Sequence, residues 1–248
     1  MTANRRQVIR DAGMSSVVSG LTGGRPLRGL CAETSHPPKR IGRVELDLDR
    51  IHKWDESHGD TWDPFWADDG QLYSFNCDGR GFGKRSENLA LNLLAGDSIE
   101  ALAGSRINSM DECGDAGQRG PDHATWKVCG QECIDGVFYA FVARNVYGHE
   151  SHDPLTRQTS LNASLLRSDD RGKTWRREAA ENYARPMWPG GGFGAPFFVH
   201  YGRNGGQVER DRASQYVYAV STNGFWNDGD SLVLGRVLRG RASGKGSD

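Results

Sequence analysis

The sequence of 248 residues lacks the features that mark several common classes of protein. It contains no run of 18 or more apolar residues, which argues against a membrane-spanning helix. It also has no excess of charge of either sign, because 31 Lys and Arg balance 32 Asp and Glu to give a net charge of −1. Without a basic surface, nothing in the composition suggests a nucleic-acid partner.

Paired C-x-x-C motifs, the spacing typical of zinc sites, are also missing. Of five cysteines, Cys31 lies near the N-terminus, and the other four are predicted to be structural, either free or disulfide-bonded: Cys77, Cys113, Cys129 and Cys133. Residues 227–230 (NDGD) resemble part of a calcium loop but lack the rest of the EF-hand spacing. The sequence therefore predicts no metal or cofactor, and a calcium ion is an unsupported alternative.

The N-terminus resembles a twin-arginine export signal. Arg5 and Arg6 form the paired arginines, and a mildly apolar stretch rich in Ala, Gly, Ser and Val follows them. We therefore expect residues 1–35 to be the signal, 36–240 the folded domain and 241–248 a flexible polar tail, in an exported protein of the periplasm or cell exterior. The alternative is an ordinary amphipathic first helix.

What the chain does contain favours an all-β protein with many tight turns. It has 33 glycines and 7 tryptophans among short apolar runs. Asp-Gly turns at 68–70 and 135–136 each separate two extended segments, which predicts two hairpins. Residues 86–104 fit either a strand pair or a short helix. Further strands are expected at 43–48, 193–202, 214–222 and 231–239.

The stretch SDDRGKTW (168–175) follows another apolar run and has hairpin spacing. Its Asp and Ser side chains can accept hydrogen bonds from nearby backbone N–H groups, and Gly172 can adopt a positive φ. Trp175 would then pack against the neighbouring layer. We interpret this stretch as a structural turn, with a ligand site as the alternative.

Short strands at regular spacing are compatible with a sandwich, a barrel or a propeller. Two segments, WADDGQLYSF (66–75) and CIDGVFYAFV (133–142), share the theme Asp-Gly-x-apolar-Tyr-x-apolar. A recurring unit of this kind favours the blades of a propeller.

These segments carry a resemblance to a known family. SDDRGKTW matches the Asp-box of sialidase-like propellers (S-x-D-x-G-x-T-W), and residues 44–240 resemble successive blades of a family of secreted bacterial five-bladed β-propellers. Some members of that family are glycoside hydrolases acting as endo-D-arabinanases. The resemblance implies an all-β, five-bladed propeller of which only about three blades are legible.

The same resemblance implies an exported glycoside hydrolase that acts on a carbohydrate polymer. An arabinan-type furanoside is favoured over sialic acid, because the arginine triad that binds a sialic acid carboxylate cannot be located. Two alternatives stay open: a non-catalytic carbohydrate-binding propeller, and an inactive truncated copy.

Glycoside hydrolysis generally needs two carboxyl groups, one as acid and one as base or nucleophile. Asp60 is the leading candidate, since it begins a strand beside Trp62. Asp78 precedes a glycine-rich bend, where a turn-forming role is favoured over a functional one, and Asp111 and Glu112 could reach a site from a loop. The adjacent acidic residues at 68–69, 135 and 169–170 are assigned to turns.

Other side chains are candidates for contacts with sugar. Trp62 and Trp66 could stack on sugar faces, although packing between blades is the alternative for such residues. Arg144 and Asn145 follow a buried-looking strand and could donate to hydroxyl groups. His123 could assist proton transfer from a polar loop, or could simply be solvated.

Overall fold

The structure is a computed structural model that describes residues 42–146, 158–177, 187–188, 192–206, 215–226 and 229–242. The chain divides into two units, one of Met14–Lys53 and one that includes Trp54–Asp248. The predicted export signal, with Arg5 and Arg6, lies outside the described residues, as do residues 227 and 228 of the calcium-like fragment. No helix within the described ranges is long and apolar enough to cross a membrane.

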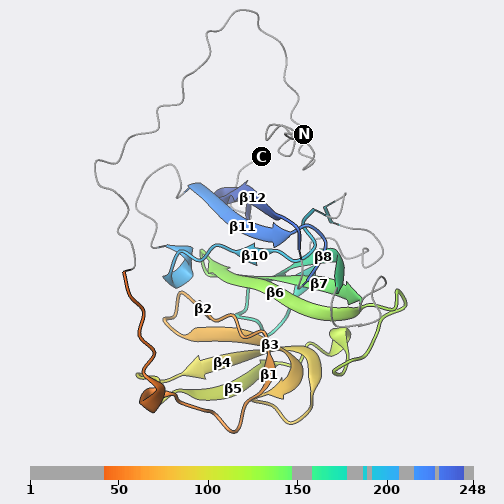
Figure 1. The fold of residues 1–248 in the computed structure, drawn as a ribbon. Coiled ribbons are helices and arrows are strands. Elements are labelled where there is room, and N and C mark those ends of the chain that lie inside the picture. The colour runs from red at the N-terminus through yellow and green to blue at the C-terminus, as the bar shows by residue number, and fades with distance from the viewer. Residues whose placement is uncertain are drawn as a thin grey trace, which may run out of the picture. The chain divides into compact units, whose positions relative to one another are not determined.

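The fold from Trp54 onward is all-β, as the sequence predicted, and consists of three antiparallel sheets (Figure 1). Sheet 1 runs in the order β1-β3-β4-β5, with β2 also paired to β3. Its strands are β1 (His58–Asp60), β2 (Phe65–Trp66), β3 (Leu72–Gly81), β4 (Glu87–Ala95) and β5 (Ala103–Asn108).

The second and third sheets are simple meanders, in which each strand pairs with the next one along the chain. Sheet 2 comprises β6 (Thr125–Ile134), β7 (Val137–Val146), β8 (Thr159–Ser168) and β9 (Arg176–Arg177). Sheet 3 comprises β10 (Phe197–Phe198), β11 (Tyr216–Thr222) and β12 (Leu232–Leu238). Among the residues that the structure describes, helical structure is limited to η1 (Leu48–Arg50), η2 (Asp111–Cys113), η3 (Arg203–Gly205) and α1 (Arg239–Ala242).

Two apolar cores join the three sheets. Between sheets 1 and 2, Phe65 and Phe138 meet edge to face with ring centroids 4.9 Å apart. Between sheets 2 and 3, Phe141 stacks on Phe198 at 4.6 Å. Sheet 2 is therefore the middle layer, and every residue of β6 and β7 is buried.

The Asp-box forms the turn that its sequence predicts, between β8 and β9. Ser168 Oγ accepts a hydrogen bond from the N–H of Gly172 at 2.7 Å, and Asp170 accepts from both the N–H and the hydroxyl of Thr174, at 2.9 and 2.6 Å. Gly172 has a φ of +81°, and a Cβ at this position would overlap Leu91 of sheet 1. Trp175 packs on Phe75 with ring centroids 5.4 Å apart, so the turn attaches sheet 2 to sheet 1.

Most other predicted elements are also confirmed. The turns at 68–70 and 135–136 join β2 to β3 and β6 to β7, and the ambiguous segment 86–104 forms β4 and the start of β5. The strand predicted at 193–202 is limited to the two residues of β10.

The strand predicted at 43–48 is wrong. These residues form no strand, and Val44 and Leu46 are 75% and 82% exposed. Alternation of apolar and charged residues supplies one apolar face, but a strand also needs a neighbour to pair with, and none is present among the described residues of this unit.

We predict that Asp170→Ala lowers the free energy of unfolding by about 1–3 kcal/mol, because three hydrogen bonds to this carboxylate are lost. Chemical denaturation monitored by tryptophan fluorescence measures the change. Asp169→Ala is the control, since Asp169 pairs with Arg167 and Arg176 at the surface and its loss should cost less than about 1 kcal/mol. Equal losses in the two variants would contradict this account of the Asp-box.

Candidate functional site

β6, the first strand of sheet 2, lies next to both of the other sheets. β6 contacts both β2 of sheet 1 and β10 of sheet 3. Charged side chains gather on these strands and on the segments beside them, and together they form what we call the first-strand site. Its members are Asp60, Asp63, Asp78, Lys127, Glu132 and His200.

One half of the first-strand site is built around Lys127 of β6. Its side chain is only 6% exposed, and its ammonium forms an ion pair with Asp78. Burial lowers the pKa of Lys127 below its ordinary value, while the negative charge of Asp60 acts in the opposite direction. The structure thus places Asp78 in contact with one buried cation, and the leading sequence candidate, Asp60, acts electrostatically on the same cation.

A bulge in β3 sets the position of Asp78. The pairing of β1 with β3 shifts between His58–Gly81 and Asp60–Cys77, and Asp78 adopts a φ of +48° within this irregular stretch. Bulges of this kind redirect a side chain out of the regular alternation of a strand. The local geometry explains how Asp78, on the second strand, reaches Lys127 on the first strand of the next sheet.

The other half is centred on His200, which follows β10. Its Nδ1 lies 2.9 Å from Glu132 Oε2, and its Nε2 lies 3.2 Å from Asp63 Oδ1. Hydrogen bonds to Asp63 and then Glu132 raise the pKa of His200 to about 10, against the effect of burial. Asp63 Oδ2 is buried and has no hydrogen-bond partner within the described part of the chain.

A bulge in β6 places Lys127 and Glu132 on the same face of sheet 2. Lys127 pairs with Ala143 and Glu132 with Tyr139, and the pairing shifts by one residue between them. The irregular position includes Gly130, where a Cβ would lie 2.5 Å from Phe197 Cα. The N–H of Gly130 donates to Pro196 O at 2.8 Å, so sheet 3 approaches closely and brings His200 within reach of Glu132.

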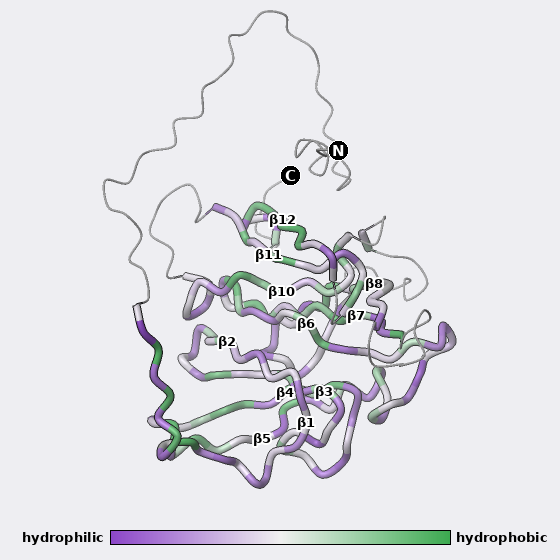
Figure 2. Tube along the Cα trace, in the orientation of Figure 1, coloured by the Kyte–Doolittle hydropathy of each residue, from purple (hydrophilic) through white to green (hydrophobic). Residues whose placement is uncertain are grey.

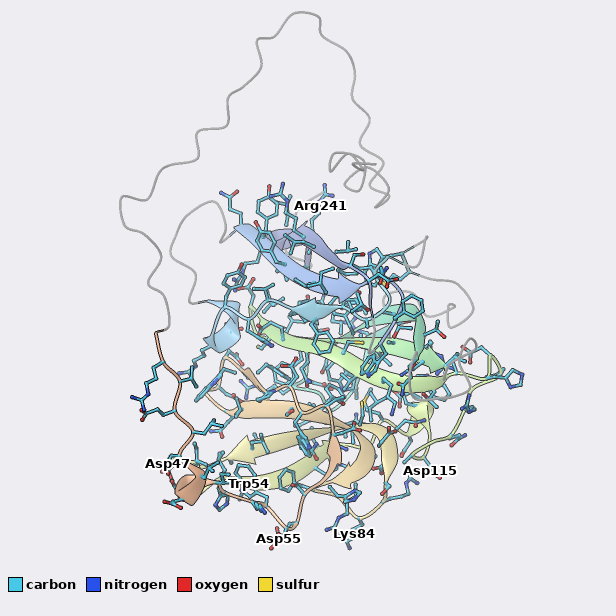
Figure 3. All side chains as sticks on the ribbon, in the orientation of Figure 1. Asp47, Trp54, Asp55, Lys84, Asp115 and Arg241 are labelled. Atoms are coloured by element: carbon cyan, nitrogen blue, oxygen red, sulfur yellow. The ribbon has the colours of Figure 1, made fainter. Side chains whose placement is uncertain are left out.

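Asp111 and Glu112 lie in η2, which follows β5. Asp111 pairs with Arg85 at 2.5 Å and is 78% exposed, and Glu112 is exposed beside it. They lie near Lys84 and Asp115, both labelled in Figure 3. A cleft of about 460 Å³ here is lined by Gly83, Lys84, Arg85, Glu87, Arg106, Ser109 and Asp111. The described contacts do not connect Asp111 or Glu112 with the first-strand site.

Three of the candidates for sugar contacts, Trp62, Trp66 and His123, differ in their surroundings. Trp62 is half-buried, donates from Nε1 to Gly59 O at 3.2 Å and meets Phe82 edge to face. Trp66 lies on β2 and is 51% exposed, so a ring face is accessible there. His123 is exposed in a loop with a φ of +60°.

Arg144 and Asn145, by contrast, are buried in β7. Arg144 is 1% exposed, stacks on Trp126 at 3.7 Å, and donates to Asp122 and to the carbonyls of Ala124 and Thr125. Asn145 Nδ2 donates to Gln158 Oε1 at 3.1 Å. In this arrangement both side chains stabilise the protein interior, which favours a structural role over the predicted contact with substrate.

The four cysteines of the described chain are all buried, and Cys77, Cys129 and Cys133 are free. Burial raises the pKa of Cys133 to about 12 and that of Cys77 above its ordinary value. Within the described ranges, no group of three or more His, Cys, Asp or Glu side chains is arranged to hold a metal ion.

Sequence reasoning missed four members of the site: Asp63, Lys127, Glu132 and His200. A signal was present for Lys127 and Glu132, since both are charged residues inside a strand that is otherwise apolar. Such residues are rarely buried unless they are paired. For Asp63 and His200 the sequence offered no comparable signal, because both lie in irregular segments.

Comparison of the chain with models of known protein families and with curated proteins finds no match.

We predict that His200 titrates near pH 10 and that folding is linked to this proton. Its pKa is raised from 6.5 in the folded state, so the stabilisation is complete below about pH 6.5 and is lost as pH rises toward 10. NMR of the imidazole nitrogens gives the midpoint directly. Asp63→Asn should lower that midpoint, because it removes the main cause of the shift, whereas a midpoint near 6.5 in the unmodified protein would contradict the geometry.

Proposed function

We propose that this chain is an exported glycoside hydrolase whose three sheets are blades of a β-propeller. The supporting observation is the set of carboxylates near β6, where Asp78 forms an ion pair with Lys127 and Asp60 acts on the charge of the same lysine. In a propeller, neighbouring blades pack face to face, and the contacts of β6 with β2, β3 and β4 of sheet 1 and with β10 of sheet 3 are compatible with that arrangement.

Within this proposal Asp78 is the base or nucleophile and Asp60 the acid. A cation in contact with a carboxyl group favours its ionised form, which a base or nucleophile requires. Asp60 is exposed at the end of β1, where it can reach a leaving oxygen. Lys127 is a positioning residue that holds Asp78 in place.

His200 has a different role in this scheme, because with a pKa of about 10 it is a poor proton donor at neutral pH. It neutralises Asp63 and Glu132 and fixes the end of β10 against β6.

The charge of the site bears on the substrate class. Four carboxylates and two cations leave the first-strand site with a net negative charge, which disfavours sialic acid, uronate and other anionic sugars. A neutral polymer such as an arabinan-type furanoside is the substrate that fits best.

A non-catalytic carbohydrate-binding protein is the second candidate, and the exposed ring of Trp66 on β2 favours it. Aromatic faces bind sugars without any need for an acid or a base. The two candidate functions differ only in whether the bound glycan is cleaved, so one set of variants distinguishes them.

We predict that the full chain releases oligosaccharides from arabinan or arabinogalactan. Asp60→Asn and Asp78→Asn should each lower the rate by about 10²–10⁴-fold, the usual contribution of a general acid or base, while glycan binding survives. Asp111→Asn is the matched control, since Asp111 pairs with Arg85 away from the site and its variant should keep full activity.

An acidic polysaccharide serves as a second control and should not be cleaved. If the folded protein binds a neutral glycan but releases no oligosaccharide, the proposal of a glycoside hydrolase is overturned and that of a carbohydrate-binding protein is supported. A folded protein that neither binds nor cleaves any glycan would point to an inactive copy.

A further inference from the structure

Sheet 3 has an apolar face that no described residue covers. Along β12 exposed and half-buried residues alternate, and the exposed set is largely leucine. Leu232, Leu234 and Leu238 are 74%, 65% and 43% exposed. The hydropathy colouring of Figure 2 shows β12 as predominantly hydrophobic.

This face continues across the other two strands of the sheet. In the antiparallel pairing, Tyr216 lies opposite Leu238 and Val220 lies opposite Leu234, so both point to the same side as the leucines. Phe197 of β10 lies opposite Val220 and is 41% exposed. We call this surface, from Phe197 to Leu238, the outer face of sheet 3.

The opposite face of sheet 3 is also apolar, and it is already buried. Phe198 and Ala219 pack there against sheet 2, with Phe198 stacked on Phe141. A sheet with water on one side normally alternates apolar and polar residues, whereas a sheet covered on both sides is apolar on both. The composition of sheet 3 is therefore that of an element with a partner on each side.

The charges on the outer face indicate what kind of partner fits. Strands β10, β11 and β12 contain no acidic residue, and their one basic residue, Arg236, lies over the ring of Tyr216 at 4.4 Å. A charged partner would therefore find few groups of opposite charge on the outer face of sheet 3. We expect the surface that binds there to be apolar.

We propose that the outer face of sheet 3 binds the same face of a second copy of this chain, in a closed two-fold dimer. An isologous contact requires a patch that is complementary to itself, and an apolar face without acidic groups meets that condition. Leu232, Leu234, Leu238, Phe197 and Val199 expose on the order of 500 Å² per copy, so two copies would bury about 1,000 Å², the lower end of specific interfaces.

A head-to-tail contact, in which this face would bind sheet 1 of the next copy, is disfavoured. In β3 the residues that point away from sheet 2 are Ser74 and Asn76, which are fully buried. Asn92 Nδ2 donates to Asn76 Oδ1 at 2.9 Å and to Ser74 O at 3.2 Å. The polar groups on that side of sheet 1 are thus already buried and bonded to one another, and they provide no apolar surface for sheet 3 of another copy. We therefore expect sheet 3 to bind sheet 3 in a closed dimer and not to form a filament.

Sedimentation equilibrium of the full chain tests the proposal. The expected mass is twice 27.3 kDa for the unmodified protein, and Leu234→Glu should return it to 27.3 kDa with an unchanged circular dichroism spectrum. Ile99→Glu is the matched control: Ile99 is 60% exposed but lies outside sheet 3, so this variant should stay dimeric.

Three results would overturn the proposal: a monomer at about 100 μM, a dimer that Leu234→Glu leaves intact, or species larger than two copies. Hydrogen exchange of the unmodified protein supplies a readout that does not depend on a variant folding. Protection of the β12 amides should fall on dilution, while that of β7, inside sheet 2, stays constant. Dilution-independent protection of β12 would also count against the dimer.

Discussion

The buried strand β6 is the element on which the other two sheets depend, and its polar side chains reach both of them. Lys127 pairs with Asp78 of sheet 1, and Gln131 Oε1 accepts a hydrogen bond from the N–H of Phe75 at 2.6 Å. Glu132 binds His200, next to sheet 3. Because all ten residues of β6 are buried, none of these groups can exchange its protein partner for water without cost. The same contacts that join the sheets also place the charges of the first-strand site.

Charge in this position is costly for stability and therefore needs an explanation. Removing an ammonium and a carboxylate from water is repaid only when geometry and hydrogen bonding are favourable, and apolar replacements often stabilise a fold as well. The apolar cores on either side of sheet 2 already join the three sheets without any help from ion pairs. In the function that we propose, the buried charge of Lys127 and its ion pair with Asp78 serve chemistry on a sugar, and the apolar cores provide stability.

Local features were predicted well from the sequence because their causes are local. The Asp-box turn and the Asp-Gly hairpins followed from residue types and spacing. The placement of Lys127 and Glu132 on one face of sheet 2 did not, since residues five apart along a regular strand point to opposite faces, and only the bulge at Gly130 brings both side chains to one face. Arg144 looked like a ligand-binding group because its burial beneath Trp126 and Asp122 depends on a loop whose path the sequence does not reveal.

The most direct test of whether the Lys127–Asp78 ion pair serves function and not stability is the free energy of unfolding of the double variant Lys127→Met/Asp78→Asn. If the ion pair serves function, its loss should leave stability within about 1 kcal/mol of the unmodified protein or raise it, because methionine fills the buried volume of the lysine stem. A decrease of about 3 kcal/mol or more in the free energy of unfolding would show that the ion pair is structural. It would contradict the central claim that Lys127 and Asp78 are charged for catalysis.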